Sequence, residues 1–167
     1  MKDEAIQNLN LKDGGIYLDA TLGMGGHTIG IINAKKNIKK IICIDNDLES
    51  IKLAKIRLEK SKSKIEFIQG NFRDIDRLIN EKVDGVIMDL GISTYQLLNP
   101  KRGFSFKKEN KLDMRINLKQ KLTAHEIVNK YTVSEISDLL FKYGEEKNHF
   151  KIASAIGRYR SKKEIST

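Results

Sequence analysis

The stretch Ile16-Tyr-Leu-Asp-Ala-Thr-Leu-Gly-Met-Gly-Gly-His27 decides the fold of this chain. Its first half is a short apolar run that ends at Asp19, which is typical of a buried strand. Its second half holds three glycines, and the apolar run 29–32 that follows can begin a helix. A strand, a glycine-rich turn and a helix in this order present backbone N–H groups to a ligand in open α/β sheets. The stretch therefore predicts a ligand-binding loop at the carboxyl end of a buried strand.

Three later segments continue the same alternation of strands and helices. The apolar runs 41–44, 65–68 and 83–88 predict strands, and amphipathic segments lie between them. In the clearest of these helices Asp47 can serve as the N-cap, and apolar residues follow on one face at helical spacing. Strands that alternate with helices predict a parallel sheet with right-handed crossovers. The expected fold is therefore an α/β fold whose first part is a sheet of four parallel strands.

The alternation stops after the fourth expected strand. Residues 90–116 are rich in glycine and polar side chains and hold the single proline, so we expect a long loop there that is either functional or disordered. Thr123-x-x-Glu126 and Thr132-x-x-Glu135 both match the capping box that begins helices, and Gly144 is a suitable residue to end the second helix. The sequence thus predicts an α/β domain over residues 1–116 and a helical region over residues 117–167.

Composition limits the class of protein and its compartment. With 40% hydrophobic and 32% charged residues the chain resembles an ordinary soluble protein, and no apolar run reaches the length of a membrane span. The N-terminal residues lack the apolar core of a signal peptide, so we expect a cytoplasmic protein with no membrane partner. The one cysteine, Cys43, lies in an apolar run and is expected to be buried. One cysteine and three scattered histidines make a metal site improbable.

The net charge of +9 favours a polyanionic partner, although a solvated lysine-rich surface is an equally common cause. Residues 101–116 hold six basic and two acidic residues, which is nearly half of the excess charge. Phe104 and Phe106 lie among them. Basic residues interleaved with aromatic ones suit phosphate contacts and base stacking, so this segment is either an RNA-binding loop or a solvated one.

The residues that follow the expected strands suggest a nucleoside ligand. Asp45 lies 22 residues after Gly23, which is about the spacing at which a carboxylate binds a ribose diol. The glycine pattern lacks the third glycine of the dinucleotide fingerprint, so a nucleoside with a small carboxylate tail, such as S-adenosylmethionine, fits better than a pyrophosphate cofactor.

Four other residues have two possible roles each. Phe72 can face an adenine or fill the core, and His27 can bind a ligand carboxylate or simply be a polar residue at a helix start. Asp19 and Asp89, which end two apolar strands, can accept hydrogen bonds from an ammonium or amine group or be unremarkable strand-end acids.

Six motifs, spread over nearly the whole chain, occur in the order of one known family. They are Asp19-Ala-Thr-Leu-Gly-Met-Gly-Gly-His-Thr28, Ile44-Asp-Asn-Asp47, Val83-Asp-Gly-Val-Ile-Met-Asp-Leu-Gly-Ile-Ser93, Arg102-Gly-Phe-Ser-Phe106, Leu112-Asp-Met-Arg115 and Tyr143-Gly-Glu-Glu146. With these motifs the chain resembles the RsmH (MraW) family of S-adenosylmethionine-dependent methyltransferases. That family methylates the N4 amine of a cytosine in the decoding region of 16S ribosomal RNA.

The resemblance implies a Rossmann-like class I methyltransferase sheet, with residues 117–167 as part of a helical insertion. It implies 16S ribosomal RNA in the small subunit as partner and S-adenosyl-L-methionine as cofactor. Carried over by position, the cofactor contacts are Gly25, Gly26, His27, Asp45, Phe72, Asp89 and Gln96. By analogy with other amino-methyltransferases, Asp89 is also the candidate catalytic acceptor near the amine. The Arg-Gly-Phe-Ser-Phe and Leu-Asp-Met-Arg segments are expected to help place the RNA.

The chain departs from the family at both ends. The family has a leading segment before this first residue, and it continues past Thr167 into further strands with a Ser-Phe-His-Ser motif that this sequence lacks. We therefore expect about half of a family member, which works as a homodimer or with the missing half. Two alternatives remain: a catalytically incomplete cofactor-binding fragment or split-protein half, and a nucleotide-dependent oxidoreductase on a related sheet.

Overall fold

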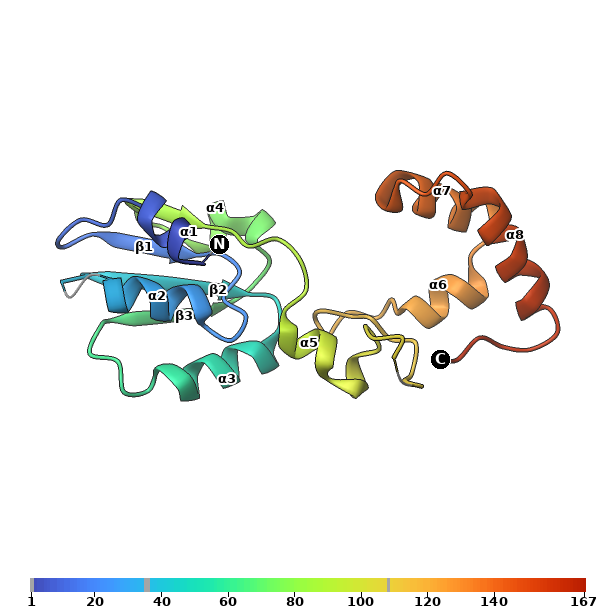
Figure 1. The fold of residues 1–167 in the computed structure, drawn as a ribbon, viewed down its shortest axis with the longest axis horizontal. Coiled ribbons are helices and arrows are strands. Elements are labelled where there is room, and N and C mark those ends of the chain that lie inside the picture. The colour runs from blue at the N-terminus through green and yellow to red at the C-terminus, as the bar shows by residue number, and fades with distance from the viewer. Residues whose placement is uncertain (1, 35–36, 108) are drawn as a thin grey trace. The chain divides into compact units, whose positions relative to one another are not determined.

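The structure is a computed structural model that describes residues 2–34, 37–107 and 109–167. The chain divides into two compact units, Met1–Tyr95 and Gln96–Thr167. Figure 1 shows the sheet with helices α1 to α4 in the first unit and helices α6 to α8 in the second.

The first unit is built on a four-stranded parallel sheet. Its strands are β1 (Ile16–Asp19), β2 (Lys40–Asp45), β3 (Ile65–Gln69) and β4 (Gly85–Ile87), in the order β3-β2-β1-β4. All three pairings are parallel, so the carboxyl ends of the strands share one edge of the sheet. The predicted parallel α/β sheet is confirmed, although β4 is shorter than the predicted strand 83–88. Strand β4 is an edge strand. Val86 within it and Met88 just after it are almost half exposed.

Four helices accompany the sheet: α1 (Lys2–Asn8), α2 (Gly26–Ala34), α3 (Leu48–Leu58) and α4 (Ile75–Leu78), the last preceded by the 3₁₀ turn η1 (Phe72–Asp74). The Asp47 N-cap of α3 is confirmed, because its side chain accepts a hydrogen bond from the Glu49 N–H. Helix α1 was not predicted. It contributes only one buried residue, Ile6, which packs against Gly30 of α2, so tertiary contact rather than a local pattern identifies it.

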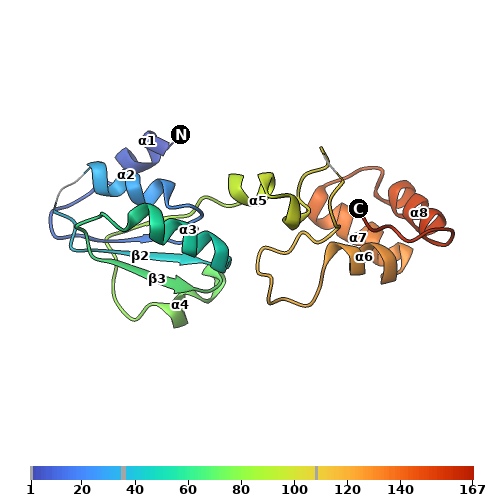
Figure 2. The same ribbon diagram turned by 90° about the horizontal axis from the view of Figure 1, so that it is seen from below.

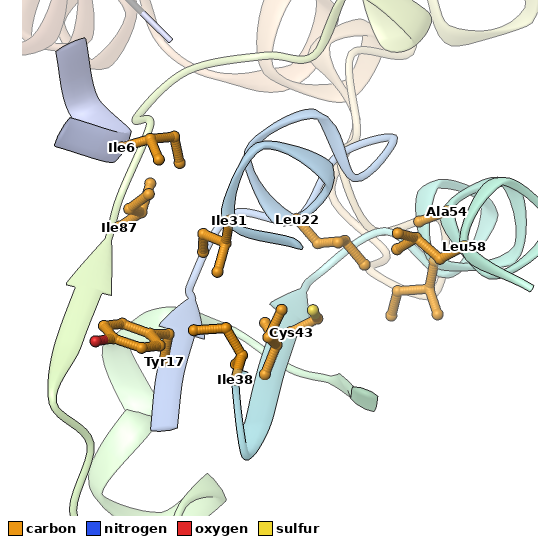
Figure 3. Close-up of a cluster of buried hydrophobic side chains, with 11 residues drawn as sticks. Ile6, Tyr17, Leu22, Ile31, Ile38, Cys43, Ala54, Leu58 and Ile87 are labelled. Atoms are coloured by element: carbon orange, nitrogen blue, oxygen red, sulfur yellow. The ribbon is translucent and has the colours of Figure 1, made fainter. Parts of the chain in front are cut away.

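Alternate side chains of β1 and β2 enter two separate apolar layers. Tyr17, Ile41 and Cys43 pack with residues of α1, α2 and α3 on one face, as Figure 3 shows for most of this layer. Leu18 and Ile42 face the opposite layer, which α4 covers. Both faces of the central strands are therefore buried, as a parallel sheet requires. The expected burial of Cys43 is confirmed.

The second unit is helical. Its main helices are α6 (Ala124–Lys130), α7 (Val133–Gly144) and α8 (His149–Arg160), grouped together in Figure 2. Both predicted capping boxes are present, at Thr123 and at Thr132. The end of α7 differs from the prediction. Gly144 is its last helical residue, and Glu145 takes the left-handed conformation (φ 50°) that was expected of the glycine.

Residues 90–116 are not simply a loop. They contain helix α5 (Thr94–Leu98) and the 3₁₀ turn η2 (Pro100–Arg102), whose Asn99 cap accepts a hydrogen bond from the Lys101 N–H. The predicted loop was too long because α5 is barely one turn, which is too short to show an apolar period.

The division into units lies before the predicted domain boundary between residues 116 and 117. Residues 112–113 explain the difference, because they bond to the helical part of the chain. The Leu112 N–H donates to the Ser166 carbonyl, and the Leu112 and Asp113 carbonyls accept from the first residues of α6. Packing thus groups the basic segment with the helices.

Among the described residues, no helix is both long and apolar enough to cross a bilayer. In the same part of the chain no three His, Cys, Asp or Glu side chains are grouped as metal ligands would be.

Candidate functional site

Hydrogen bonds tie together the segments that follow the four strands. The Gly23 N–H after β1 donates to Asp45 Oδ2 at the end of β2 over 2.7 Å. The Gly70 N–H after β3 donates to the Asp45 carbonyl over 3.0 Å. The Asp89 N–H after β4 donates to Thr21 Oγ1 over 2.7 Å. Residues 68 positions apart in the chain thus meet at the carboxyl edge of the sheet, where open α/β folds bind their ligands.

The glycine loop between β1 and α2 is a tight turn closed by the Gly25 N–H, which donates to the Leu22 carbonyl over 2.8 Å. Gly25 has φ +78°, and a Cβ there would lie 3.1 Å from Leu58 Cδ1 of α3. A side chain there would strain the left-handed backbone and would force Leu58 to shift by a few tenths of an ångström. Gly26 is exposed and begins α2, and His27 follows in the first turn, half-buried. This turn directs N–H groups without intrahelical partners away from the helix.

Asp45, at the end of β2, holds the glycine loop between β1 and α2 by hydrogen bonds. Its Oδ2 accepts from Gly23, and its Oδ1 accepts from the Asp47 N–H over 2.8 Å. Burial raises the pKa of Asp45 from its ordinary value, against the opposing effect of these two N–H donors. Each carboxylate oxygen keeps a second lone pair, so the side chain can still accept from a hydroxyl group.

Asp19 lies beneath the loop rather than in contact with a ligand. It is completely buried, and Thr28 Oγ1 of α2 donates to its Oδ2 over 2.7 Å. Thr28 Oγ1 also lies 3.4 Å from Cys43 Sγ. Burial raises the pKa of Asp19, and it raises the pKa of the Cys43 thiol to about 12. The interpretation of Asp19 as an acceptor for a ligand amine is thus not supported, since its side chain has no exposed surface.

Two threonines that the sequence analysis did not single out bear directly on the site. The Thr21 hydroxyl accepts a hydrogen bond from the Asp89 N–H after β4, and the Thr28 hydroxyl joins the start of α2 to Asp19. Both lie in the ten-residue motif from Asp19 to Thr28, so their hydroxyl groups were already visible in the sequence.

Asp89 and Phe72 lie at the same edge and are exposed. The Phe72 side chain is 40% exposed at the start of η1, where Asn71 caps the turn by accepting from the Arg73 N–H. Phe72 is thus only partly buried, and its contact with an adenine stays a prediction. The Asp89 carboxylate is exposed while its N–H is held by Thr21.

Gln96, the last expected cofactor contact, belongs to the second unit, where it is buried. Its role as a cofactor contact stays a prediction.

The Arg-Gly-Phe-Ser-Phe and Leu-Asp-Met-Arg segments form one bonded structure within the second unit. Arg102 is buried, and its guanidinium donates to the carbonyls of Arg115 and Ile116 over 2.9 and 2.5 Å. Arg115 pairs with Asp113 over 2.7 Å and holds the pKa of that carboxyl below its usual value. Two of the six basic residues proposed for RNA contact therefore have internal roles. Phe106, in contrast, is 97% exposed.

Comparison with known proteins identifies the family. The sequence profile described as the MraW methylase family matches residues 1–167. The chain belongs to this family. The ribosomal RNA small subunit methyltransferase H of Clostridium botulinum (strain Kyoto / Type A2) is 44% identical over 99% of this chain and 54% of that protein. The protein of the same name from Fusobacterium nucleatum is 42% identical over 97% of this chain and 53% of that protein. The chain spans about half the length of these curated relatives.

Solved structures show a more distant likeness. An rRNA methylase from Streptococcus thermophilus is 24% identical with a TM-score of 0.46, over 55% of this chain and 53% of that one. NSun6 from Pyrococcus horikoshii is 19% identical with a TM-score of 0.49, over 54% of this chain and 23% of that one. Both scores are below 0.5, so the fold assignment rests on the strand order and pairing of the MraW family member itself.

Proposed function

We propose that this chain carries the S-adenosylmethionine-binding part of a methyltransferase that acts on the N4 amine of a cytosine in 16S ribosomal RNA. Membership in the MraW methylase family and the names of the curated relatives support methyl transfer to ribosomal RNA over the oxidoreductase alternative. The N4 position and the decoding region follow from the resemblance to the RsmH (MraW) family, and a cytoplasmic compartment fits relatives that are named for ribosomal RNA.

The observation that carries the proposal is the bonded carboxyl edge of the sheet. The residues there match the chemistry of an adenosine with an amino-acid tail. Asp45 offers lone pairs to a ribose diol, and Phe72 offers an exposed aromatic face to an adenine. At Gly26 the space that a Cβ would occupy is open, so that a ligand carboxylate can approach the start of α2 and His27.

The chain's own residues would act mainly by placement. The cofactor supplies a methyl group on a sulfonium, which is already strongly electrophilic. The cytosine amine is a weak nucleophile because its lone pair is delocalised, so the rate gain comes chiefly from alignment with that methyl group. The Asp89 carboxylate can accept a hydrogen bond from the amine as positive charge develops on it. The same carboxylate can instead contact the cofactor, and the two roles predict different variant behaviour.

The first experiment replaces the Asp45 carboxylate by an amide and measures the affinity for S-adenosylhomocysteine by isothermal titration calorimetry. In Asp45→Asn an amide NH₂ would face one of the two N–H donors, Gly23 or Asp47, so the loop loses a hydrogen bond and gains a repulsion. We expect about tenfold weaker binding or more, equal to about 1.4 kcal/mol.

Asp84→Asn is the matched control. Its Oδ2 also accepts a backbone N–H, from Ile16, but at the opposite, amino end of β1. Equal losses in both variants, or none in either, would contradict the assignment of the cofactor to the carboxyl edge.

The second experiment assays methylation of small ribosomal subunits with Asp89→Asn. If Asp89 acts on the amine, methyl transfer falls while S-adenosylhomocysteine affinity is retained. If affinity falls in parallel, Asp89 is a cofactor contact. A wild-type chain that binds the cofactor but transfers no methyl group, alone or with the rest of a family member, would favour the binding-fragment alternative.

A further inference from the structure

Nearly all of the chain's net charge belongs to the second unit. Sixteen of the 31 Lys and Arg residues and eight of the 22 Asp and Glu residues follow Tyr95, which is a formal charge of +8 out of +9. The first unit, with the cofactor-type site, is almost neutral. Such a division separates a site for a small ligand from a surface that attracts a polyanion.

Internal bonds in the second unit use more of its acidic side chains than of its basic ones. Five of the eight acids accept hydrogen bonds or form ion pairs within the unit: Asp113, Glu126, Glu135, Glu146 and Glu164. Among the Lys and Arg residues that the structure describes in this unit, four have such partners: Arg102, Arg115, Lys130 and Arg160. The other Lys and Arg side chains that the structure describes in this unit are exposed, so the unit presents an excess of positive charge to solvent.

Helix α8 arranges three of these cations on one line. Its core-facing side is defined by Ala153, which is fully buried, and by Gly157, where a Cβ would lie 2.7 Å from Val133 of α7. Lys151, Arg158 and Lys162 are exposed on the opposite side, at helical spacings of seven and four residues. Lys162 follows the helix end, where the N–H groups of Ser161 and Lys163 still bond to the carbonyls four residues earlier, those of Gly157 and Tyr159.

The composition of this line favours a polyanion over a protein core. From His149 to Lys163 the sequence contains no acidic residue, and small Ala155 lies between the cations. Burying three unpaired cations against protein costs more free energy than apolar contacts return, whereas phosphate groups neutralise them and release counterions. Tyr159, 56% exposed on the same side of the helix, offers a ring for base stacking.

We propose that the basic face formed by Lys151, Arg158 and Tyr159 of α8 and by Lys162 just after it binds the phosphate backbone of the substrate RNA. The inference rests on the proposed function, because it extends the contact between the enzyme and its RNA. It adds a second RNA surface to the one expected near Phe106.

The test uses the full chain and a fluorescent single-stranded RNA from the decoding region, with binding followed by anisotropy over a range of salt concentrations. The variant replaces Lys151, Arg158 and Lys162 by Gln. The slope of log affinity against log salt should fall by about 2, since each phosphate contact contributes about 0.7 for single strands. The affinity at 0.15 M salt should fall by about tenfold or more.

The matched control replaces three exposed lysines of the first unit, Lys60, Lys62 and Lys64, by Gln. It removes the same charge at the amino end of β3 and should change the slope little. A charge-preserving variant, Lys151→Arg with Arg158→Lys and Lys162→Arg, should bind RNA like the wild type. Circular dichroism checks that each variant keeps its helices.

Equal slopes for the α8 variant and the control would overturn the proposal, as would a wild-type chain that binds phosphatidylserine vesicles but no RNA. Calorimetry with S-adenosylhomocysteine on the same variants separates this proposal from the proposed function. The α8 variant should keep its affinity for that ligand, whereas a wild-type chain that fails to bind it counts against the methyltransferase assignment and not against the α8 face.

Discussion

At the scale of single residues, buried polar groups hold the glycine loop in shape. Asp19 lies at the end of β1, and its carboxylate accepts a hydrogen bond from the Thr28 hydroxyl of α2. This bond joins the strand before the glycine loop to the helix after it. Burial of this carboxyl disfavours its charged form and raises its pKa. Asp19 thus lowers the free energy of unfolding near neutral pH, while its hydrogen bond defines the geometry of the loop.

Asp19→Asn tests this cost through its pH dependence. In the wild type the folded pKa exceeds the unfolded value of 3.8, so the folded protein loses stability as pH rises from 3.8 through the folded pKa. Asn has no charge to bury, so over that window the unfolding free energy of Asp19→Asn should rise relative to the wild type. Urea denaturation at several pH values measures this difference.

Thr28→Val provides a second check on the same residue. It removes a hydrogen bond that lowers the pKa of Asp19, so the window should extend to higher pH than in the wild type. A pH-independent difference between Asp19→Asn and the wild type would mean that the carboxyl is ionised in the folded state as easily as in the unfolded chain.

At the scale of elements, two glycines of the second unit differ in whether the backbone could accept a side chain in their place. Gly103 has φ +74°, and a Cβ there would lie 2.3 Å from the Lys111 carbonyl oxygen. Gly144 ends α7 with no atom within 4 Å of a built Cβ. The first glycine is needed for the turn that joins η2 to the Leu-Asp-Met-Arg segment, and the second is replaceable.

Gly103→Ala should destabilise the second unit by about 2 kcal/mol or more, because both the left-handed backbone and the backbone contact oppose a side chain. Gly144→Ala should be neutral or stabilising by about 0.5 kcal/mol, since alanine favours a helix. Denaturation followed by far-ultraviolet circular dichroism compares the two. A larger loss for Gly144→Ala than for Gly103→Ala would show that the described turn is wrong.

At the scale of the whole molecule, we expect the first unit to bind the cofactor and the second unit to bind the RNA. The cofactor would contact loops that follow the strands of the first unit, and the RNA backbone would contact α8 in the second. Hydrogen exchange can separate these contacts, because a ligand slows exchange most where it binds and orders the chain.

We expect S-adenosylhomocysteine to protect amides of residues 21–28, 45–47 and 89–91, and a decoding-region RNA to protect residues 151–162. Mass spectrometry after exchange, with each ligand alone, measures the pattern. Protection by S-adenosylhomocysteine confined to α7 and α8 would contradict the division.

The sequence by itself determined the parallel sheet, the Asp47 cap, both capping boxes and the family. These features depend on neighbouring residues, since strand runs, helical spacings and caps are local patterns. It also placed Gly23 and Asp45 at one edge, because parallel strands end together.

Only the tertiary structure decided which side chains remain available. Asp19 and Arg102 are polar residues that looked suited to ligand contact, yet both are buried on internal partners. Helix α1 forms because Ile6 meets Gly30, and the cations of α8 face outward because Ala153 and Gly157 face the core. Burial and pairing arise from residues far apart in the chain, so no local pattern reveals them.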